Sequence, residues 1–142
     1  KPEGLDRLLI VAQGMTPNQE LNKLKELMPV YKSEDDLDIF TPVRKTNRDY
    51  AIWVRDQREA DDFLIEGDNS ITLEELLLFE IKYFLETCKN LDVQNITRCG
   101  GSRDAAGRLP RVCWSGHYGA LFVSYCGPGG MSGRLCTRKV VF

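Results

Sequence analysis

The spacing of the apolar residues changes near residue 93, and this change limits the folds open to the chain. Before residue 93, apolar residues recur at intervals of three and four, which is typical of amphipathic helices. After it they alternate with other residues, which is typical of strands with one buried face. Helices followed by strands predict an α+β fold, with N-terminal helices packed on a small, mostly antiparallel sheet.

The first predicted helix covers residues 15–28. Thr16 is its expected N-cap, with Pro17 in the first turn and Gln19 at the position that completes a capping box. Its apolar face is formed by Leu21, Leu24, Leu27 and Met28.

The second predicted helix covers residues 71–88 and begins with another capping box, Thr72 with Glu75. Its apolar residues cover more than one face, so we expect it to be packed on two sides. Residues 29–49 contain two prolines and are predicted to be loop with short extended pieces. Residues 50–54 have strand composition, and the charged segment 55–70 has no clear pattern.

The C-terminal part is predicted to contain several short strands. The turn between the two central ones is expected at 115–119, and a glycine-rich loop follows at 126–133. The strands are expected at residues 93–99, 111–115, 121–126 and 135–142.

Alternation divides the two central strands into unlike faces. One face is apolar and suits a core: Val112, Trp114, Leu121, Val123 and Tyr125. The other has no consistent chemistry: Arg111, Cys113, Ser115, Phe122, Ser124 and Cys126.

Composition also changes sharply along the chain. Residues 97–142 contain seven Lys and Arg against one Asp, a net charge of +6, and the chain total of −2 leaves −8 for the first 96 residues. All ten Glu and all four Gln lie in those first 96, whereas nine of twelve Gly and four of five Cys lie in the last 46. A shift of this kind marks a functional boundary.

The cysteines and the apolar runs indicate the cellular compartment of the protein and whether it crosses a membrane. Five cysteines without a C-x-x-C pair indicate free thiols in a reducing environment, which favours the cytoplasm. The run LLIVA (8–12) is too short to span a bilayer, so no membrane span is expected.

A nucleophile or metal site, a nucleic-acid surface and a phosphate-binding loop each lack a feature that they require. Cys113 and His117 could form a nucleophile pair or bind metal, but no orienting third group is evident. The arginines are scattered and have few aromatic neighbours, so nucleic-acid binding is not expected. GPGG (127–130) lacks the following Lys-Ser/Thr of a phosphate-binding loop. We expect no catalytic residue, metal or cofactor.

A set of ordered motifs from residue 71 onward resembles a known family. The motifs are ITLEELLLFEIKYF, LDVQNIT, GGSR (100–103), P-x-V-x-W (110–114), L-x-V-x-Y (121–125), and the closing Leu135 and Arg138. They resemble the variable proteins of diversity-generating retroelements, which have C-type lectin-like folds. The match covers roughly residues 70–142, and residues 15–56 more weakly.

The resemblance implies both a fold and a reason for the composition. In that family, reverse transcription randomises adenines, chiefly in AAC and AAT codons, which can never become Lys, Glu, Gln, Met or Trp codons. The missing Glu and Gln of the tail agree with this. The resemblance implies a single C-type lectin-like domain over 1–142, with 97–142 as the variable region and 1–14 as a candidate linker from an upstream segment.

The expected function is therefore a ligand-binding display protein with a protein or other macromolecular partner. Arg111, Tyr118 and Phe122 would be the energetic anchors, since Arg and aromatic residues dominate interfaces. The expected ligand-binding residues are Arg111, Cys113, Ser115, His117, Tyr118, Phe122, Ser124, Cys126, Gly127, Gly129 and Gly130. Two alternatives remain: a relative of the formylglycine-generating oxidase that uses Cys113 and Cys126, and a basic nucleic-acid-binding domain.

Overall fold

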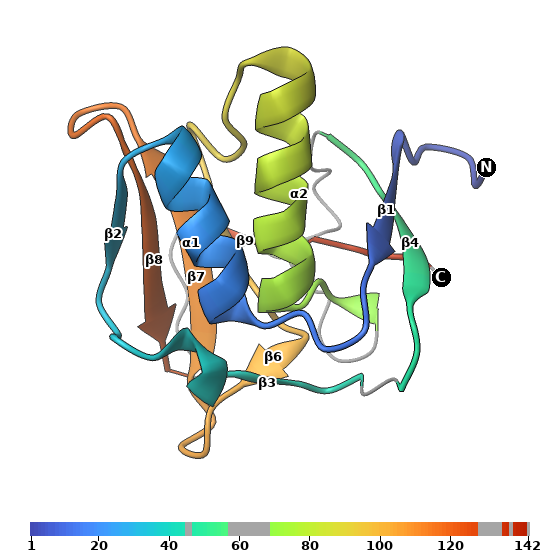
Figure 1. Cartoon of the computed structure of the whole chain (residues 1–142), viewed down its shortest axis with the longest axis horizontal. Coiled ribbons are helices and arrows are strands. Elements are labelled where there is room, and N and C mark those ends of the chain that lie inside the picture. Colours follow the sequence, from blue (N-terminus) through green and yellow to red (C-terminus); the bar gives the residue numbers. More distant parts are fainter. Residues whose placement is uncertain (45–46, 57–68, 128–134, 137, 142) are drawn as a thin grey trace.

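The computed structural model describes residues 1–44, 47–56, 69–127, 135–136 and 138–141 (Figure 1). In chain order its elements are β1 (Arg7–Val11), α1 (Pro17–Leu27), β2 (Val30–Lys32), the 3-10 helix η1 (Leu37–Ile39), β3 (Thr41–Pro42), β4 (Tyr50–Val54), α2 (Leu73–Thr87), β5 (Ile96–Arg98), β6 (Ser102–Arg103), β7 (Leu109–Ser115), β8 (Ala120–Cys126) and β9 (Leu135–Cys136). The α+β class is confirmed.

Both predicted capping boxes are present. The Thr16 side chain accepts a hydrogen bond from the Gln19 backbone, and the Gln19 side chain accepts one from the Thr16 backbone. Thr72 and Glu75 form the same reciprocal pair at the start of α2. These side chains satisfy donors that the helix leaves open, so each helix begins within two residues of its expected position.

The principal sheet has the strand order β2-β8-β7-β5-β9. The central pairs β8–β7 and β7–β5 are antiparallel, as expected, whereas the outer pairs β2–β8 and β5–β9 are parallel. The sheet is therefore mixed, because its two outer strands, β2 and β9, are distant in sequence from their neighbours and pair with them in parallel. The turn predicted at 115–119 lies between β7 and β8, where Ser115 pairs with Ala120.

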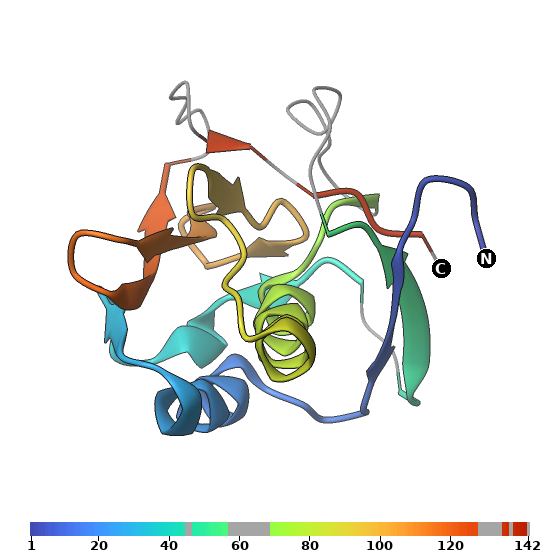
Figure 2. The ribbon, with the colours of Figure 1, turned by 90° about the horizontal axis from the view of Figure 1, so that it is seen from above.

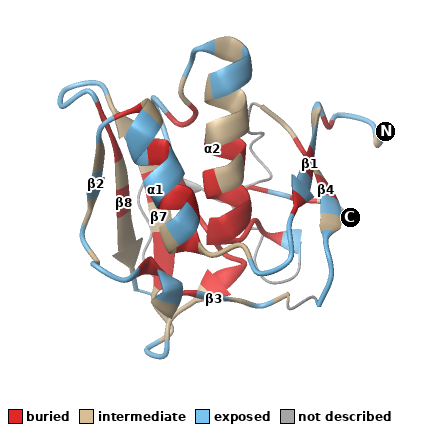
Figure 3. Cartoon of the chain, in the orientation of Figure 1, coloured by how far each residue is buried: buried red, intermediate tan, exposed pale blue. Residues whose placement is uncertain are grey.

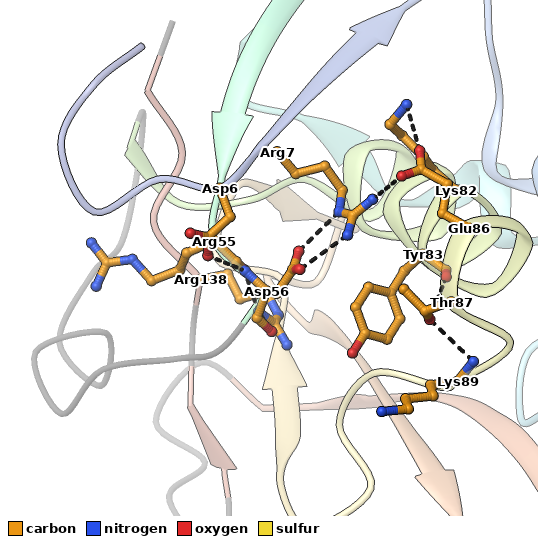
Figure 4. A network of polar contacts seen from close by, with 10 residues as sticks. All are labelled: Asp6, Arg7, Arg55, Asp56, Lys82, Tyr83, Glu86, Thr87, Lys89 and Arg138. Atoms are coloured by element: carbon orange, nitrogen blue, oxygen red, sulfur yellow. Dashed lines mark hydrogen bonds and ion pairs between the residues drawn. The ribbon is translucent and has the colours of Figure 1, made fainter.

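A second, two-stranded sheet pairs β1 with β4. The candidate linker at 1–14 thus contains a strand that is paired along its whole length. Arg7 on β1 hydrogen-bonds to Asp56 and to Glu86 of α2, which ties this sheet to the helix (Figure 4). Trp53 of β4 also bridges to Val141 near the C-terminus.

The core lies between the helices and one face of the principal sheet. Both helices lie on the same side of that sheet (Figures 1 and 2), and the buried residues concentrate where they face it (Figure 3). Residues 71–77 are all buried, so the first half of α2 is packed around its circumference, as expected from its apolar pattern. In the part of the chain that the structure covers, neither α-helix is long and apolar enough to cross a bilayer.

The GGSR stretch (100–103) packs tightly against the first turn of α2 and hydrogen-bonds to it. A Cβ atom on Gly101 would lie 2.5 Å from the Ser70 carbonyl oxygen, so only glycine fits without movement. The next residue, Ser102, accepts a hydrogen bond from the Leu73 amide at 2.9 Å. This hydroxyl therefore satisfies another open donor in the first turn of α2.

Candidate functional site

The β7–β8 hairpin has one buried and one accessible face, as its alternation predicts. Val112 pairs with Val123 and Trp114 with Leu121. Val112, Leu121 and Val123 are at most 1% exposed, and Trp114 and Tyr125 pack against the same core as partly buried residues. This inner face carries the packing, so the opposite face is left for other interactions.

We call that opposite face of β5, β7 and β8, together with the 116–119 turn, the outer face. Six of the expected ligand-binding residues lie on its strands and are half-buried: Arg111, Cys113, Ser115, Phe122, Ser124 and Cys126. His117 and Tyr118 in the turn and Gly127 after β8 are exposed. Gly129 and Gly130 lie outside the described residues.

Strand register arranges the outer face in rows. Arg98, Arg111 and Ser124 lie side by side on β5, β7 and β8, and Arg111 Nε donates a hydrogen bond of 2.7 Å to Ser124 Oγ. The neighbouring row places Cys113 opposite Phe122, and Phe122 opposite Tyr31 of β2. A polar, cationic row thus borders an apolar and aromatic one, about 7 Å away along the strands.

Aromatic rings gather at the turn end of the outer face. The Phe122 ring lies edge-on to Tyr31 at a centroid distance of 5.3 Å and is stacked with Tyr118 at 5.6 Å. The His117 ring is edge-on to Tyr118 at 4.7 Å. Tyr31 and Tyr118 are 61% and 65% exposed, an accessibility typical of rings that bind a partner rather than fill a core.

A hollow of about 220 Å³ adjoins this aromatic group at the edge of the sheet. Tyr31 and Ser33 line it from β2 and the residue after it, and Phe122 and Ser124 line it from β8. Tyr31 was absent from the expected site, because the sequence around it is polar and proline-flanked. Its strand is three residues long, and its pairing partner lies some ninety residues later in the chain.

The cysteines of the expected site are not brought together. Cys113 lies opposite Phe122 and Cys126 opposite Leu109, four residues apart along the hairpin or about 13 Å. Burial raises the pKa of the Cys126 thiol against the opposing effect of Arg98 and Arg111, which disfavours the reactive thiolate. Within the described residues, no group of three or more His, Cys, Asp or Glu is placed to hold a metal ion.

The motifs that carry the family resemblance have structural roles away from the outer face. Arg138 is 4% exposed and donates to Asp92 Oδ1 at 2.9 Å and to the Arg55 carbonyl at 3.1 Å. Thr97 Oγ1 donates to the other Asp92 oxygen at 2.6 Å. These contacts join β5 and the chain end to the segment after α2, and Arg138 also lies over the ring of Phe79 in α2.

A group of buried carboxyls on the helices was not anticipated from the sequence. Glu20 is 4% exposed, and neither of its carboxyl oxygens has a hydrogen-bond partner. Burial, reinforced by Glu74 and Glu75, raises its pKa to about 10. Glu75 instead pairs with Arg44 and accepts a hydrogen bond from Tyr50. A glutamate on a helix is ordinarily solvated, so its residue type gave no signal of burial.

A larger cavity of about 410 Å³ lies near these carboxyls, between β1, α1 and β4. Glu74, Tyr50 and Phe40 line it. Burial raises the pKa of Glu74 to about 7. This cavity belongs to the acidic half of the chain and is separate from the outer face.

Searches against protein-family models, curated proteins and solved structures found no match to this chain.

Proposed function

We propose that this chain is a ligand-binding display protein of C-type lectin-like fold, whose outer face and adjoining loops form a hypervariable surface diversified by a retroelement. The observation that carries the proposal is the division of the hairpin. Its inner face is uniformly apolar and packs against the core, while its outer face holds a cation, two thiols, two hydroxyls and an aromatic ring, all half-buried.

The composition of the tail supports the same proposal. Codons diversified from AAC or AAT cannot encode Glu or Gln, and residues 97–142 contain neither. The motif residues of the tail, such as Gly101, Ser102 and Arg138, make framework contacts instead. A variable surface on a fixed framework requires this separation of roles.

Two matched libraries test the proposal. One randomises outer positions 113, 115, 122 and 124, and the other randomises inner positions 112, 114, 121 and 123, each displayed on yeast. We expect most outer-face variants to remain folded and to yield binders to an arbitrary folded protein, and few inner-face variants to fold, because inner substitutions disrupt close packing. Equal tolerance on both faces would contradict the proposal.

The neighbouring DNA provides a second test. We expect a reverse transcriptase gene and a near-copy of the codons for about residues 103–138, with mismatches at adenines. Among related isolates, substitutions should fall on the outer face. Substitutions spread evenly over both strand faces would overturn the retroelement assignment.

A further inference from the structure

The hollow at the edge of the sheet has walls suited to a flat apolar group. Tyr31 and Phe122 bound it, with their rings edge-on to one another at 5.3 Å. Rings in this arrangement offer both a face and an edge to a further aromatic group. Its volume of about 220 Å³ is below that of typical drug-sized pockets, so it suits a single side chain.

Positive charge lies at and beside this hollow, since Lys32 lines it and Arg111 hydrogen-bonds to one of its lining residues. Ser124 lines the hollow and accepts the Arg111 Nε hydrogen bond. Arg98 lies directly opposite Arg111 on the neighbouring strand, and both guanidiniums act on the Cys126 thiol. Arg111 Nε donates to a neutral hydroxyl, and the terminal nitrogens of the same guanidinium can donate to an incoming anion.

The spacing of these features sets the size of the ligand group. The row holding Phe122 and the row holding Arg111 and Ser124 are two residues apart along the strands, or about 7 Å. A phenyl ring and a carboxylate on the same or the next residue of a peptide can span this interval. Arginine binds a carboxylate through two parallel hydrogen bonds, so the pairing is directional as well as electrostatic.

Resting on the proposed function, we propose that the outer face of this chain binds a protein partner that packs an aromatic side chain into the hollow against the rings of Tyr31 and Phe122 and sets a neighbouring carboxylate against Arg111. A protein fits better than a nucleic acid, because Arg98 beside Arg111 is only 4% exposed and the hollow holds a single group, whereas a polyanion needs several accessible cations. The binding of a single carboxylate depends on the arginines close to it, because salt screens the charge of residues farther away.

An amide-resolved NMR titration with a minimal probe tests the inference. N-acetylphenylalanine carries the ring and the carboxylate, its amide carries the ring alone, and acetate carries the charge alone. We expect millimolar binding of N-acetylphenylalanine with shifts centred on Tyr31, Phe122 and Ser124, at least fivefold weaker binding of the amide, and no saturable binding of acetate. Equal binding of acid and amide, or shifts centred elsewhere, would overturn the inference.

Three variants identify the groups responsible. Arg111→Gln should remove the preference for the acid over the amide, whereas Arg111→Lys should retain part of it. Tyr31→Ala should weaken acid and amide alike. Lys25→Gln, an exposed charge loss on α1 on the other side of the sheet, is the matched control and should change nothing. A preference that survives Arg111→Gln in a folded variant would refute the role of Arg111.

The outcomes separate this inference from the proposed function. A tolerant outer-face library combined with a probe that does not bind would reject the inference alone. An intolerant library would reject the display function, while the titration would still decide whether the hollow binds an aromatic acid. Tighter binding of a thymidine dinucleotide than of N-acetylphenylalanine would assign the site to nucleic acid and overturn the inference.

Discussion

The Arg138–Asp92 junction, where the tail meets the segment after α2, and the outer face of the β7–β8 hairpin are built differently. At the junction, Arg138, Asp92 and Thr97 are at most 8% exposed and are joined by hydrogen bonds to one another. On the outer face Arg111, Cys113, Phe122 and Ser124 are half-buried, and the hydrogen bond from Arg111 to Ser124 joins two of them.

The difference between the junction and the outer face indicates where substitutions are tolerated. A residue at the junction takes part in several contacts at once, so its replacement leaves buried partners unsatisfied. A residue on the outer face can change with little effect on the core, because Val112 and Val123 on the other side of the same strands carry the packing.

Arg138→Ala should have the largest effect. It would remove a cation that hydrogen-bonds to the buried Asp92 carboxylate, so we expect the free energy of unfolding to fall by about 3–5 kcal/mol. Chemical denaturation monitored by circular dichroism measures this loss. Arg111→Ala is the comparison on the outer face and should cost less than about 1 kcal/mol. Similar losses for the two variants would remove the distinction between the regions.

Gly101→Ala should destabilise the fold by about 1–3 kcal/mol, because the added Cβ would meet the Ser70 carbonyl oxygen at 2.5 Å. Gly116→Ala in the hairpin turn is the matched control, since a Cβ there has nothing within 4 Å. Urea unfolding of both variants measures the difference. An unchanged midpoint for Gly101→Ala would show that Gly101 is not tightly packed against the Ser70 backbone.

Glu20→Gln tests the buried carboxyls on the helical side of the core. The pKa of Glu20 is raised to about 10 in the folded protein, so the folded state holds this proton more tightly than the unfolded state does. The stability associated with this proton is present below the unfolded pKa, near 4.5, and is lost as pH rises toward 10.

The glutamine variant carries no titratable group at this position, so its stability should vary less with pH across that range. At pH 8 we expect it to exceed the parent by on the order of 2 kcal/mol. Thermal unfolding from pH 4 to 9 measures both curves. Parallel curves for parent and variant would contradict the raised pKa of Glu20.

Cys113→Ser and Ser124→Ala on the outer face should have the smallest effects, within about 0.5 kcal/mol of the parent. The same denaturation measurements apply, with Val112→Ala as the inner-face control. A Cys113→Ser variant that loses an activity detectable in the parent would favour the cysteine-dependent oxidase over a display protein.

Local signals predicted the parts of the fold that depend on neighbouring residues. The two capping boxes located the helix starts, and alternation in 111–115 and 121–126 separated the buried from the accessible face. Alternation does not determine register, which depends on the turn and on the rest of the sheet. Alternation therefore places Cys113 and Cys126 correctly on the same face, but it does not show that four residues separate their levels.

Features formed by distant segments could not be predicted from local patterns. The strand β1 within residues 1–14 depends on pairing with β4, and β2 depends on parallel pairing with β8. The burial of Glu20 follows from the approach of α1 to α2. In each case the stabilising contact is made by a part of the chain that the local pattern does not include.

Tyr31 has a consequence for any repertoire built on this chain. It belongs to the acid-rich first 96 residues, yet β2 runs beside β8 (Figure 1), and the Tyr31 ring contacts the Phe122 ring on the outer face. Every member of such a repertoire would share this tyrosine while its neighbours differ. A single substitution at residue 31 would therefore alter the target preference of all members together, which makes it the first position to change when redesigning the scaffold.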